Sequence, residues 1–283
     1  MASRRVIESF FVDHDVGDVR HAGKETPGFV PKMLDTACAA RRGWNLAFGA
    51  AMPNMFFSLR VPAILEKVPE TVTPEQALMS GVLANGLHWG QSVGGVGIGS
   101  AVVVQGIGQQ GLATVMACRN AGAYPIIAVG LSRDASCLRL AESFGADHVV
   151  LADAVDVADA VGEITAGVMA DVVIELTGTA ASFVRALDLV KPGGTVVHGS
   201  LTGAGPEVAV PLDKIVWRQI RIQGVYSKPI EAVRVAMGLM QTGGLPIERI
   251  ISHRFSLSEA NQALELIEQG GDFVKVVLTP EVG

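Results

Sequence analysis

The chain of 283 residues is long enough for one large domain or two smaller ones, and 49% hydrophobic with 18% charged residues is the composition of a folded globular protein. A net charge of −6 without clustered lysine and arginine argues against binding to nucleic acid. No run of about 18 apolar residues occurs, so we expect no membrane span. Cys38, Cys118 and Cys137 are too widely spaced for a disulfide framework or a metal-binding pair, which favours a reducing, cytoplasmic compartment.

Short apolar, β-branched runs recur at even intervals through the second part of the chain. They begin near residues 101, 125, 148, 171 and 195. The segments between them have helical periodicity, as in 109–122, where apolar residues recur every three or four positions. Apolar strands separated by helices predict a parallel sheet buried on both faces and joined by right-handed crossovers. The pattern therefore predicts an α/β fold with a doubly wound parallel Rossmann sheet.

The first of these strands runs directly into three glycines at the spacing G-x-G-x-x-G, in the stretch VVVQGIGQQG. In a dinucleotide site the first glycine makes the tight turn, the second lets backbone approach a pyrophosphate, and the third packs helix against strand. Backbone amides at the start of the helix then point at the phosphates. The alternative is a glycine-rich turn that holds no ligand. We predict that six residues contact the pyrophosphate: Gly106, Ile107, Gly108, Gln109, Gln110 and Gly111.

The end of the second strand decides which nicotinamide dinucleotide fits best. In an NAD site, an acidic residue about 20 residues past the glycines accepts hydrogen bonds from the adenosine ribose. Here the strand ends on Gly130, and Ser132 and Arg133 follow, which offer a hydroxyl and a guanidinium to a 2′-phosphate. NADP(H) is therefore favoured over NAD(H). The alternative makes Arg133 a solvated surface charge and Asp134 the N-cap of the next helix, which leaves the preference open.

Five segments resemble a known family, and the likeness extends from about Val61 to the C-terminus. They are VVVQGIGQQGLATVMACRNAGA, LRLAESFGADHVV, DVVIELTG, VKPGGTVVHGS and FSLSEANQALELIEQGGDFVKVVL. In content and order they resemble the medium-chain dehydrogenase/reductase superfamily of zinc-type alcohol and polyol dehydrogenases. The resemblance implies an N-terminal GroES-like β-barrel, then a dinucleotide-binding domain, then a segment that returns to the barrel. We expect a truncated barrel at 1–85, completed by 250–283, and the Rossmann domain at 86–249.

The resemblance also implies contacts to the nicotinamide dinucleotide beyond the glycine loop. They come from residues that follow the fourth and fifth strands and from the segment VYSK: Thr177, Gly178, Gly199, Ser200 and Tyr226. Tyr226 is a candidate proton donor by position only. His198 either reaches the nicotinamide or packs against a helix, and His88 either lines the cleft or is structural. No residue is assigned as catalytic.

Zinc-dependent members of this superfamily usually present an early cysteine, a Gly-His-Glu, and a further Cys or Glu before the dinucleotide domain. This chain has no Gly-His-Glu, and Val82 stands where the last ligand would lie. Cys38 stands alone where many members hold a structural zinc with four cysteines. Because a catalytic metal needs about three protein ligands and an open position, we expect no zinc.

Two classes of function fit these features. The first is a zinc-independent oxidoreductase that moves a hydride between the nicotinamide and a small alcohol, carbonyl or activated alkene. The second is a catalytically inactive module that binds the coenzyme as a structural subunit or redox sensor. The resemblance also implies a homodimer, because the family extends its sheet across a two-fold axis in the region of QIRIQGVY, 219–226, and EVAVPL at 207–212 reads as a short apolar strand suited to that edge pairing.

Overall fold

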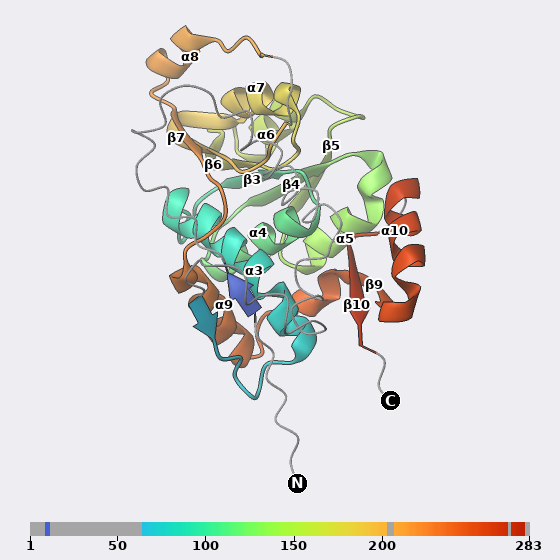
Figure 1. Cartoon of the computed structure of the whole chain (residues 1–283). Helices are drawn as coiled ribbons and strands as arrows, with labels where there is room; N and C mark the ends of the chain where they lie inside the picture. The colour runs from blue at the N-terminus through green and yellow to red at the C-terminus, as the bar shows by residue number, and fades with distance from the viewer. Residues whose placement is uncertain (1–8, 12–63, 203–206, 271–272, 281–283) are drawn as a thin grey trace, which may run out of the picture. The chain divides into compact units, whose positions relative to one another are not determined.

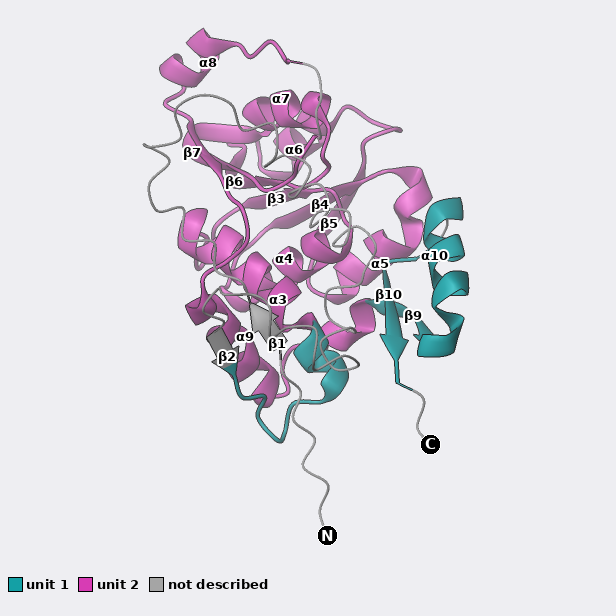
Figure 2. Cartoon of the chain, viewed as in Figure 1, with its two compact units in different colours: residues 1–78, 251–283 teal, residues 79–250 magenta. Residues whose placement is uncertain are grey.

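The computed structural model describes residues 9–11, 64–202, 207–270 and 273–280 (Figure 1). The chain divides into two compact units, one of residues 1–78 and 251–283 and the other of residues 79–250 (Figure 2). Most of the segment predicted to be a truncated barrel falls on residues 12–63, outside the described part of the chain. The barrel and the predicted domain limits therefore stay predictions.

The unit of residues 79–250 is built on a six-stranded parallel sheet with the strand order β5-β4-β3-β6-β7-β8. The strands are β3 (Val102–Gln105), β4 (Ile126–Gly130), β5 (His148–Leu151), β6 (Ala170–Glu175), β7 (Val190–His198) and β8 (Arg221–Gly224). The first five coincide with the five apolar runs of the sequence, so the predicted doubly wound parallel sheet is confirmed. Its chain order reverses between β3 and β6, and ligands of such sheets bind at the carboxyl ends of the strands beside this point.

Helices cover both faces of this sheet. The helical segments between residues 74 and 250 are α3 (Pro74–Leu87), η3 (His88–Val93), α4 (Gln109–Asn120), η4 (Ser132–Asp134), α5 (Ala135–Ser143), α6 (Val157–Ile164), α7 (Ala180–Leu189), α8 (Leu212–Trp217), α9 (Ile230–Gln241) and η5 (Ile247–Ile250). The contacts place α4, α5 and η3 on one face and α6 and α7 on the other (Figure 1). Every residue of β3 and β4 is buried, which explains why these runs are continuously apolar.

One face of the sheet and the helices α6 and α7 enclose a continuous hydrophobic core. Val103, Ile127 and Val173 of the sheet pack in one cluster with Val161 of α6 and Leu187 of α7. All five side chains are fully buried. Burial of an aliphatic side chain of this size stabilises a fold by about 1.5–3 kcal/mol, so this layer holds the carboxyl ends of the strands in fixed positions.

Carboxylates fasten the starts of the strands, at the end of the sheet opposite the glycine loop. Asp171 Oδ2 accepts a hydrogen bond of 2.8 Å from the amide of Ala101, just before β3. Asp147 Oδ2 accepts one of 2.8 Å from the amide of Ile126, the first residue of β4, and Asp147 also pairs with Arg119 of α4. Side chains therefore anchor the amino ends of β3 and β4.

The unit of residues 1–78 and 251–283 contains two small sheets among the described residues. The strands β1 (Ser9–Phe11) and β2 (Ile64–Glu66) pair antiparallel, and β9 (Ile251–Ser256) and β10 (Lys275–Thr279) pair in parallel. Between β9 and β10 lie η6 (Leu257–Glu259) and α10 (Ala260–Gln269). Arg254 of β9 donates hydrogen bonds of 2.6 and 2.8 Å to the Glu75 carboxylate, and this pairing lowers the pKa of Glu75.

The prediction of a strand at 207–212 is wrong for this chain. Residues 207–211 form no regular structure, and α8 begins at Leu212. Pro211 occupies the N-cap position of α8, and its lack of an amide hydrogen removes a donor that a strand ladder would need.

None of the described helices is long and apolar enough to cross a membrane.

Candidate functional site

The glycine loop lies at the carboxyl end of β3 and leads directly into α4. A Cβ atom at Gly111 would lie 2.1 Å from the carbonyl oxygen of Gly106, so the packing of loop against helix excludes any side chain there. A Cβ atom at Gly108 would meet nothing within 4 Å. The loop is therefore tightly packed on its inner side and open on its outer side, as a backbone that approaches a ligand must be.

The start of α4 offers hydrogen-bond donors to an anion. Gly108 is its N-cap residue, and no side chain caps this end. The first amides of a helix have no partner within the helix and carry partial positive charge, which suits a phosphate. Gln109 Oε1, in the first turn, is buried and has no hydrogen-bond partner among the described residues. The six predicted contact residues are consecutive here, and their backbone fits a pyrophosphate.

Two polar residues belong to the helical segments that precede β3, and one of them contacts the first turn of α4. Asn85 Nδ2 donates a hydrogen bond of 3.2 Å to Gln110 Oε1, which joins α3 to the first turn of α4. His88, at the start of η3, has a buried Nδ1 atom without a partner in the described part of the chain. Burial lowers the pKa of His88, which keeps its imidazole neutral at pH 7. His88 does not line the pocket described below, and the geometry favours the structural interpretation.

The end of β6 carries a buried carboxylate that the sequence analysis did not single out. Glu175 is fully buried, and its Oε1 atom accepts hydrogen bonds from the amide of Thr177, at 2.7 Å, and from the Thr177 hydroxyl. Its Oε2 atom makes a hydrogen bond of 2.8 Å with His198 Nδ1 and accepts one of 2.7 Å from Ser200 Oγ. One carboxylate thus fixes two of the predicted contact residues, Thr177 and Ser200, together with His198.

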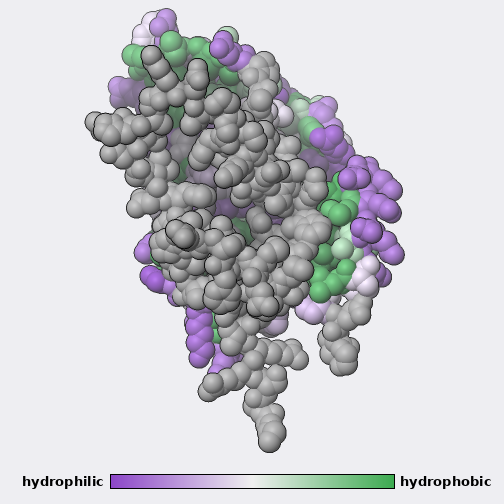
Figure 3. Space-filling model, in the orientation of Figure 1, coloured by the Kyte–Doolittle hydropathy of each residue, from purple (hydrophilic) through white to green (hydrophobic). Residues whose placement is uncertain are grey.

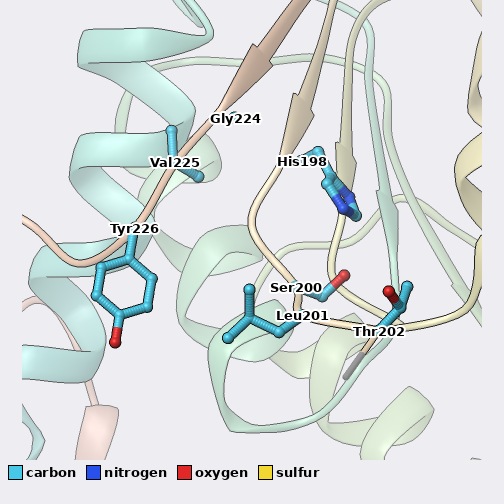
Figure 4. A pocket seen from close by; sticks show the side chains of 7 residues that line it. All are labelled: His198, Ser200, Leu201, Thr202, Gly224, Val225 and Tyr226. Carbon is cyan, nitrogen blue, oxygen red and sulfur yellow. The ribbon is translucent and has the colours of Figure 1, made fainter. Parts of the chain in front are cut away.

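A pocket of about 470 Å³ opens at the carboxyl ends of β7 and β8 (Figure 4). Its lining residues are His198, Ser200, Leu201, Thr202, Gly224, Val225 and Tyr226. The His198 side chain is 27% exposed, and its ring lies 4.9 Å from that of Phe183 in α7. The ring therefore packs against a helix and also lines the pocket, and its contact with a nicotinamide stays a prediction.

The remaining predicted contacts lie in the turns at the same edge of the sheet. Gly178 has a φ angle of +73°, which glycine adopts without strain, in the turn between β6 and α7. A Cβ atom at Gly199 would lie 2.9 Å from a side-chain carbon of Leu176, so β7 passes close to the end of β6. Tyr226 follows β8 and is 77% exposed. Four strand ends, from β3, β6, β7 and β8, thus bring the predicted residues to one edge.

The end of β4 differs from the prediction in one respect. Ser132 does follow the strand, but its amide donates hydrogen bonds of 2.9 and 3.1 Å to the Asp153 carboxylate, and its hydroxyl donates one of 3.0 Å. The hydroxyl expected to serve a 2′-phosphate is therefore already held by an acid. Asp153 lies just past β5, and only the pairing of β4 with β5 shows that the two residues meet.

Arg133 and Asp134 agree with both interpretations of this segment. The Arg133 side chain is 81% exposed, and its Nε atom lies 3.9 Å from Asp134 Oδ1. Asp134 holds the N-cap position of α5, and its Oδ2 atom accepts a hydrogen bond of 2.9 Å from the amide of Leu131. The guanidinium thus lies near one carboxylate, that of Asp134, and its exposure leaves it accessible to a ligand.

The described residues contain no group of three His, Cys, Asp or Glu side chains placed to hold a metal ion. Cys38 lies outside the described residues, so the expectation of a chain without zinc stays a prediction. Cys118 is fully buried in α4, and this burial raises the pKa of its thiol to about 12. A buried thiol of this kind packs as a small apolar side chain of the core.

Comparison with known proteins identifies relatives of the chain. Residues 111–242 match the family model described as zinc-binding dehydrogenase. Sorbitol dehydrogenase from Gallus gallus is 30% identical over 268 residues, which cover 89% of this chain and 71% of that protein. A probable alcohol dehydrogenase from Mycobacterium tuberculosis (strain CDC 1551 / Oshkosh) is 33% identical over 220 residues, 76% of this chain and 60% of the other.

Solved structures show the same relationship. An alcohol dehydrogenase from Thermus sp. ATN1 superposes with a TM-score of 0.71 at 28% identity, covering 77% of this chain and 61% of that one. A protein from Sinorhizobium meliloti 1021, classed as a zinc-binding dehydrogenase and solved bound to NADP, gives a TM-score of 0.69 at 35% identity, covering 76% and 62%. The chain spans less than two thirds of the length of the mycobacterial relative and of both solved structures.

Proposed function

Because the chain belongs to the medium-chain dehydrogenase/reductase superfamily of zinc-type alcohol and polyol dehydrogenases, we propose that it is an NAD(P)H-dependent oxidoreductase. The proposed reaction transfers a hydride between the nicotinamide and an alcohol, a carbonyl or an activated alkene, without zinc. The observation that carries the proposal is the glycine loop, which joins an open backbone at Gly108 to an uncapped helix N-terminus at the sheet's reversal point.

Each part of the proposed site has its own task. Backbone amides of residues 106–111 bind the pyrophosphate, while Thr177 and Ser200, both held by Glu175, orient the nicotinamide half. The bound coenzyme supplies or accepts the hydride. A proton must also move, at the oxygen of an alcohol or carbonyl or at the α-carbon of an activated alkene. Two side chains that line the pocket can exchange it, His198 and Tyr226.

The contact with Glu175 suits His198 to this role. A carboxylate accepts hydrogen bonds, so the contact of 2.8 Å favours the form of His198 with hydrogen on Nδ1. The other ring nitrogen, Nε2, is then the atom that takes up or releases a proton. Ser200 Oγ shares the same carboxylate oxygen and limits rotation of the group.

The proposed function is tested by titrating the purified chain with NADPH and NADH, followed by nicotinamide fluorescence, with metal content measured on the same sample. Binding and turnover of an aldehyde, enone or quinone by a metal-free sample would support the zinc-independent enzyme. Binding without turnover of any of the three would support the alternative, an inactive coenzyme-binding module, which the missing Gly-His-Glu favours. A folded sample that binds neither coenzyme would overturn both proposals.

We propose that Arg133 gives the site its preference for NADP(H). The guanidinium lies exposed just past β4, and the S. meliloti neighbour was solved with NADP. Arg133→Ala should weaken NADPH binding about tenfold, because one charge-assisted contact to the 2′-phosphate is lost, and should change NADH affinity little. The measurement is fluorescence titration of both coenzymes. Arg139→Ala, which removes an exposed charge from α5, is the matched control, and an equal loss for NADPH and NADH would exclude the role of Arg133.

We also propose that the chain forms a homodimer and works in the cytoplasm, the compartment that its cysteine usage favours. Large apolar side chains of α8 are exposed, with Trp217 at 82% and Val216 at 71%. Figure 3 shows hydrophobic surface at the end of the view where Figure 1 places α8. The neighbouring strand β8 is an exposed sheet edge, which pairing with a second copy would cover.

Trp217→Glu should therefore shift the chain from dimer to monomer at micromolar concentration, because it places a charge on the apolar surface of α8. Sedimentation velocity of both proteins checks the shift. Val168→Glu is the control, since it places the same charge on another exposed apolar residue, 61% exposed and remote in sequence from α8. A wild-type chain that sediments as a monomer would rule out the proposed dimer.

A further inference from the structure

The carboxylate of Asp153 holds both hydrogen-bond donors of Ser132. Three hydrogen bonds, of 2.9, 3.1 and 3.0 Å, join the amide and hydroxyl of Ser132 to the two oxygens of Asp153. Both residues are exposed, so neither is needed to fill the core. An exposed serine whose two donors converge on one carboxylate forms a negatively charged group at the surface.

The strand register explains why the two residues meet. Gly130 of β4 pairs with Leu151 of β5, and Ser132 and Asp153 each follow this pair by two residues. The carboxylate therefore stands at the carboxyl edge of the sheet, beside the strand end that reads the adenosine ribose in dinucleotide-binding folds. β4 itself ends without an acid, on Gly130, and the acid comes instead from the next strand.

The charges at this position oppose one another. The hydrogen bond from the Ser132 amide is the main cause that lowers the pKa of Asp153, and the charge of Arg133 lowers it further. Asp153 is therefore ionised at neutral pH, and its charge interacts with that of Arg133. A 2′-phosphate placed here would be attracted by Arg133 and repelled by Asp153.

We propose that Asp153 is a coenzyme-selectivity residue: held on Ser132 beside Arg133, it opposes the 2′-phosphate and limits the preference of the chain for NADP(H). This inference rests on the proposed coenzyme site. The carboxylate acts in two ways, because it repels the phosphate and also keeps the Ser132 donors from it. Its remaining lone pairs can accept a hydrogen bond from the 2′-hydroxyl of NAD(H).

Removing the charge should therefore shift selectivity toward NADPH. Asp153→Asn keeps the shape and one acceptor oxygen, and we expect NADPH to bind about tenfold more tightly, because a phosphate of nearly two charges no longer faces a carboxylate. NADH affinity should stay the same or fall slightly. Asp153→Ala also releases the Ser132 donors and should shift the ratio of the two dissociation constants at least as far.

The experiment measures dissociation constants for NADPH and NADH by fluorescence titration, at low and high salt. The gain for NADPH should shrink at high salt, since exposed charges are screened. Asp159→Asn is the matched control, because it removes the same charge from the first turn of α6, and no hydrogen bond joins Asp159 to Ser132 or Arg133. In Asp159→Asn, the ratio of the dissociation constants for NADPH and NADH should equal that of the wild type.

The outcomes separate this inference from the proposed function. If wild type and variants bind both coenzymes and the ratio does not move in Asp153→Asn or Asp153→Ala, the selectivity role is wrong while the coenzyme site stands. An equal shift in Asp159→Asn would mean that net charge alone sets the ratio, and would also overturn the role. If no protein binds either coenzyme, the proposed function itself fails.

Discussion

Gly108→Ala should weaken the binding of both NADPH and NADH by about 2 kcal/mol, or roughly thirtyfold, without changing the stability of the chain. Gly108 has φ −82° and ψ −167°, a conformation that alanine adopts, and its Cβ would meet nothing within 4 Å. The added methyl group would instead occupy the open side of the loop, where we propose that the pyrophosphate binds. Fluorescence titration and thermal unfolding of the same preparation check the two halves of the prediction.

Two further glycines serve as controls for Gly108. Gly97 precedes β3 in a glycine-rich loop, and its Cβ would also meet nothing within 4 Å, so Gly97→Ala should change neither binding nor stability. Gly111→Ala should lower stability, because its Cβ would lie 2.1 Å from the carbonyl oxygen of Gly106. Wild-type coenzyme affinity in Gly108→Ala would show that the loop is a turn without a ligand.

Glu175→Leu should destabilise the chain by about 1–3 kcal/mol, because it leaves four partly buried donors without their shared acceptor. The affected groups are the amide and hydroxyl of Thr177, Nδ1 of His198 and Oγ of Ser200. Urea unfolding checks the change through the midpoint at constant slope. The same variant should also weaken coenzyme binding, since Thr177 and Ser200 lose the group that positions them.

Glu175→Gln separates charge from hydrogen bonding. Glutamine keeps the volume and one acceptor oxygen, but its amide nitrogen would face donors. We therefore expect a free energy of unfolding between those of the wild type and the leucine variant. If Glu175→Leu unfolds at the same urea concentration as the wild type, the carboxylate does not organise this edge of the sheet. Retained affinity in a destabilised variant would limit its role to folding.

The sequence was sufficient to predict the central sheet and the glycine loop because both depend on local patterns. β4 is buried along its whole length, so its residues must be apolar one after another, and the run ends on Gly130 as predicted. Gly106, with a φ angle of +91°, and Gly111, which admits no side chain, require glycine for reasons internal to one turn. Such constraints act between residues close in sequence, so they leave a recognisable spacing of apolar residues and glycines in the sequence.

The polar contacts at the strand ends were not predictable in the same way. Glu175 and His198 are 23 residues apart, and they meet because β6 and β7 pair in the register that places them opposite each other. Ser132 and Asp153 meet through the register of β4 and β5. A sequence shows an acid after an apolar run, but the identity of its partner depends on strand order. The failed strand at 207–212 has a different cause, because Pro211 lacks the amide hydrogen that a strand ladder needs and instead precedes α8.

The carboxylates that anchor the strand starts have a consequence for how this sheet can change. Asp171 and Asp147 tie the backbone at one end, far along the strands from the glycine loop and the pocket. Substitutions at the carboxyl ends of the strands can therefore change which ligand binds without breaking the hydrogen bonds that anchor the strand starts. Anchoring of β3 and β4 and choice of ligand are thus assigned to opposite ends of the sheet.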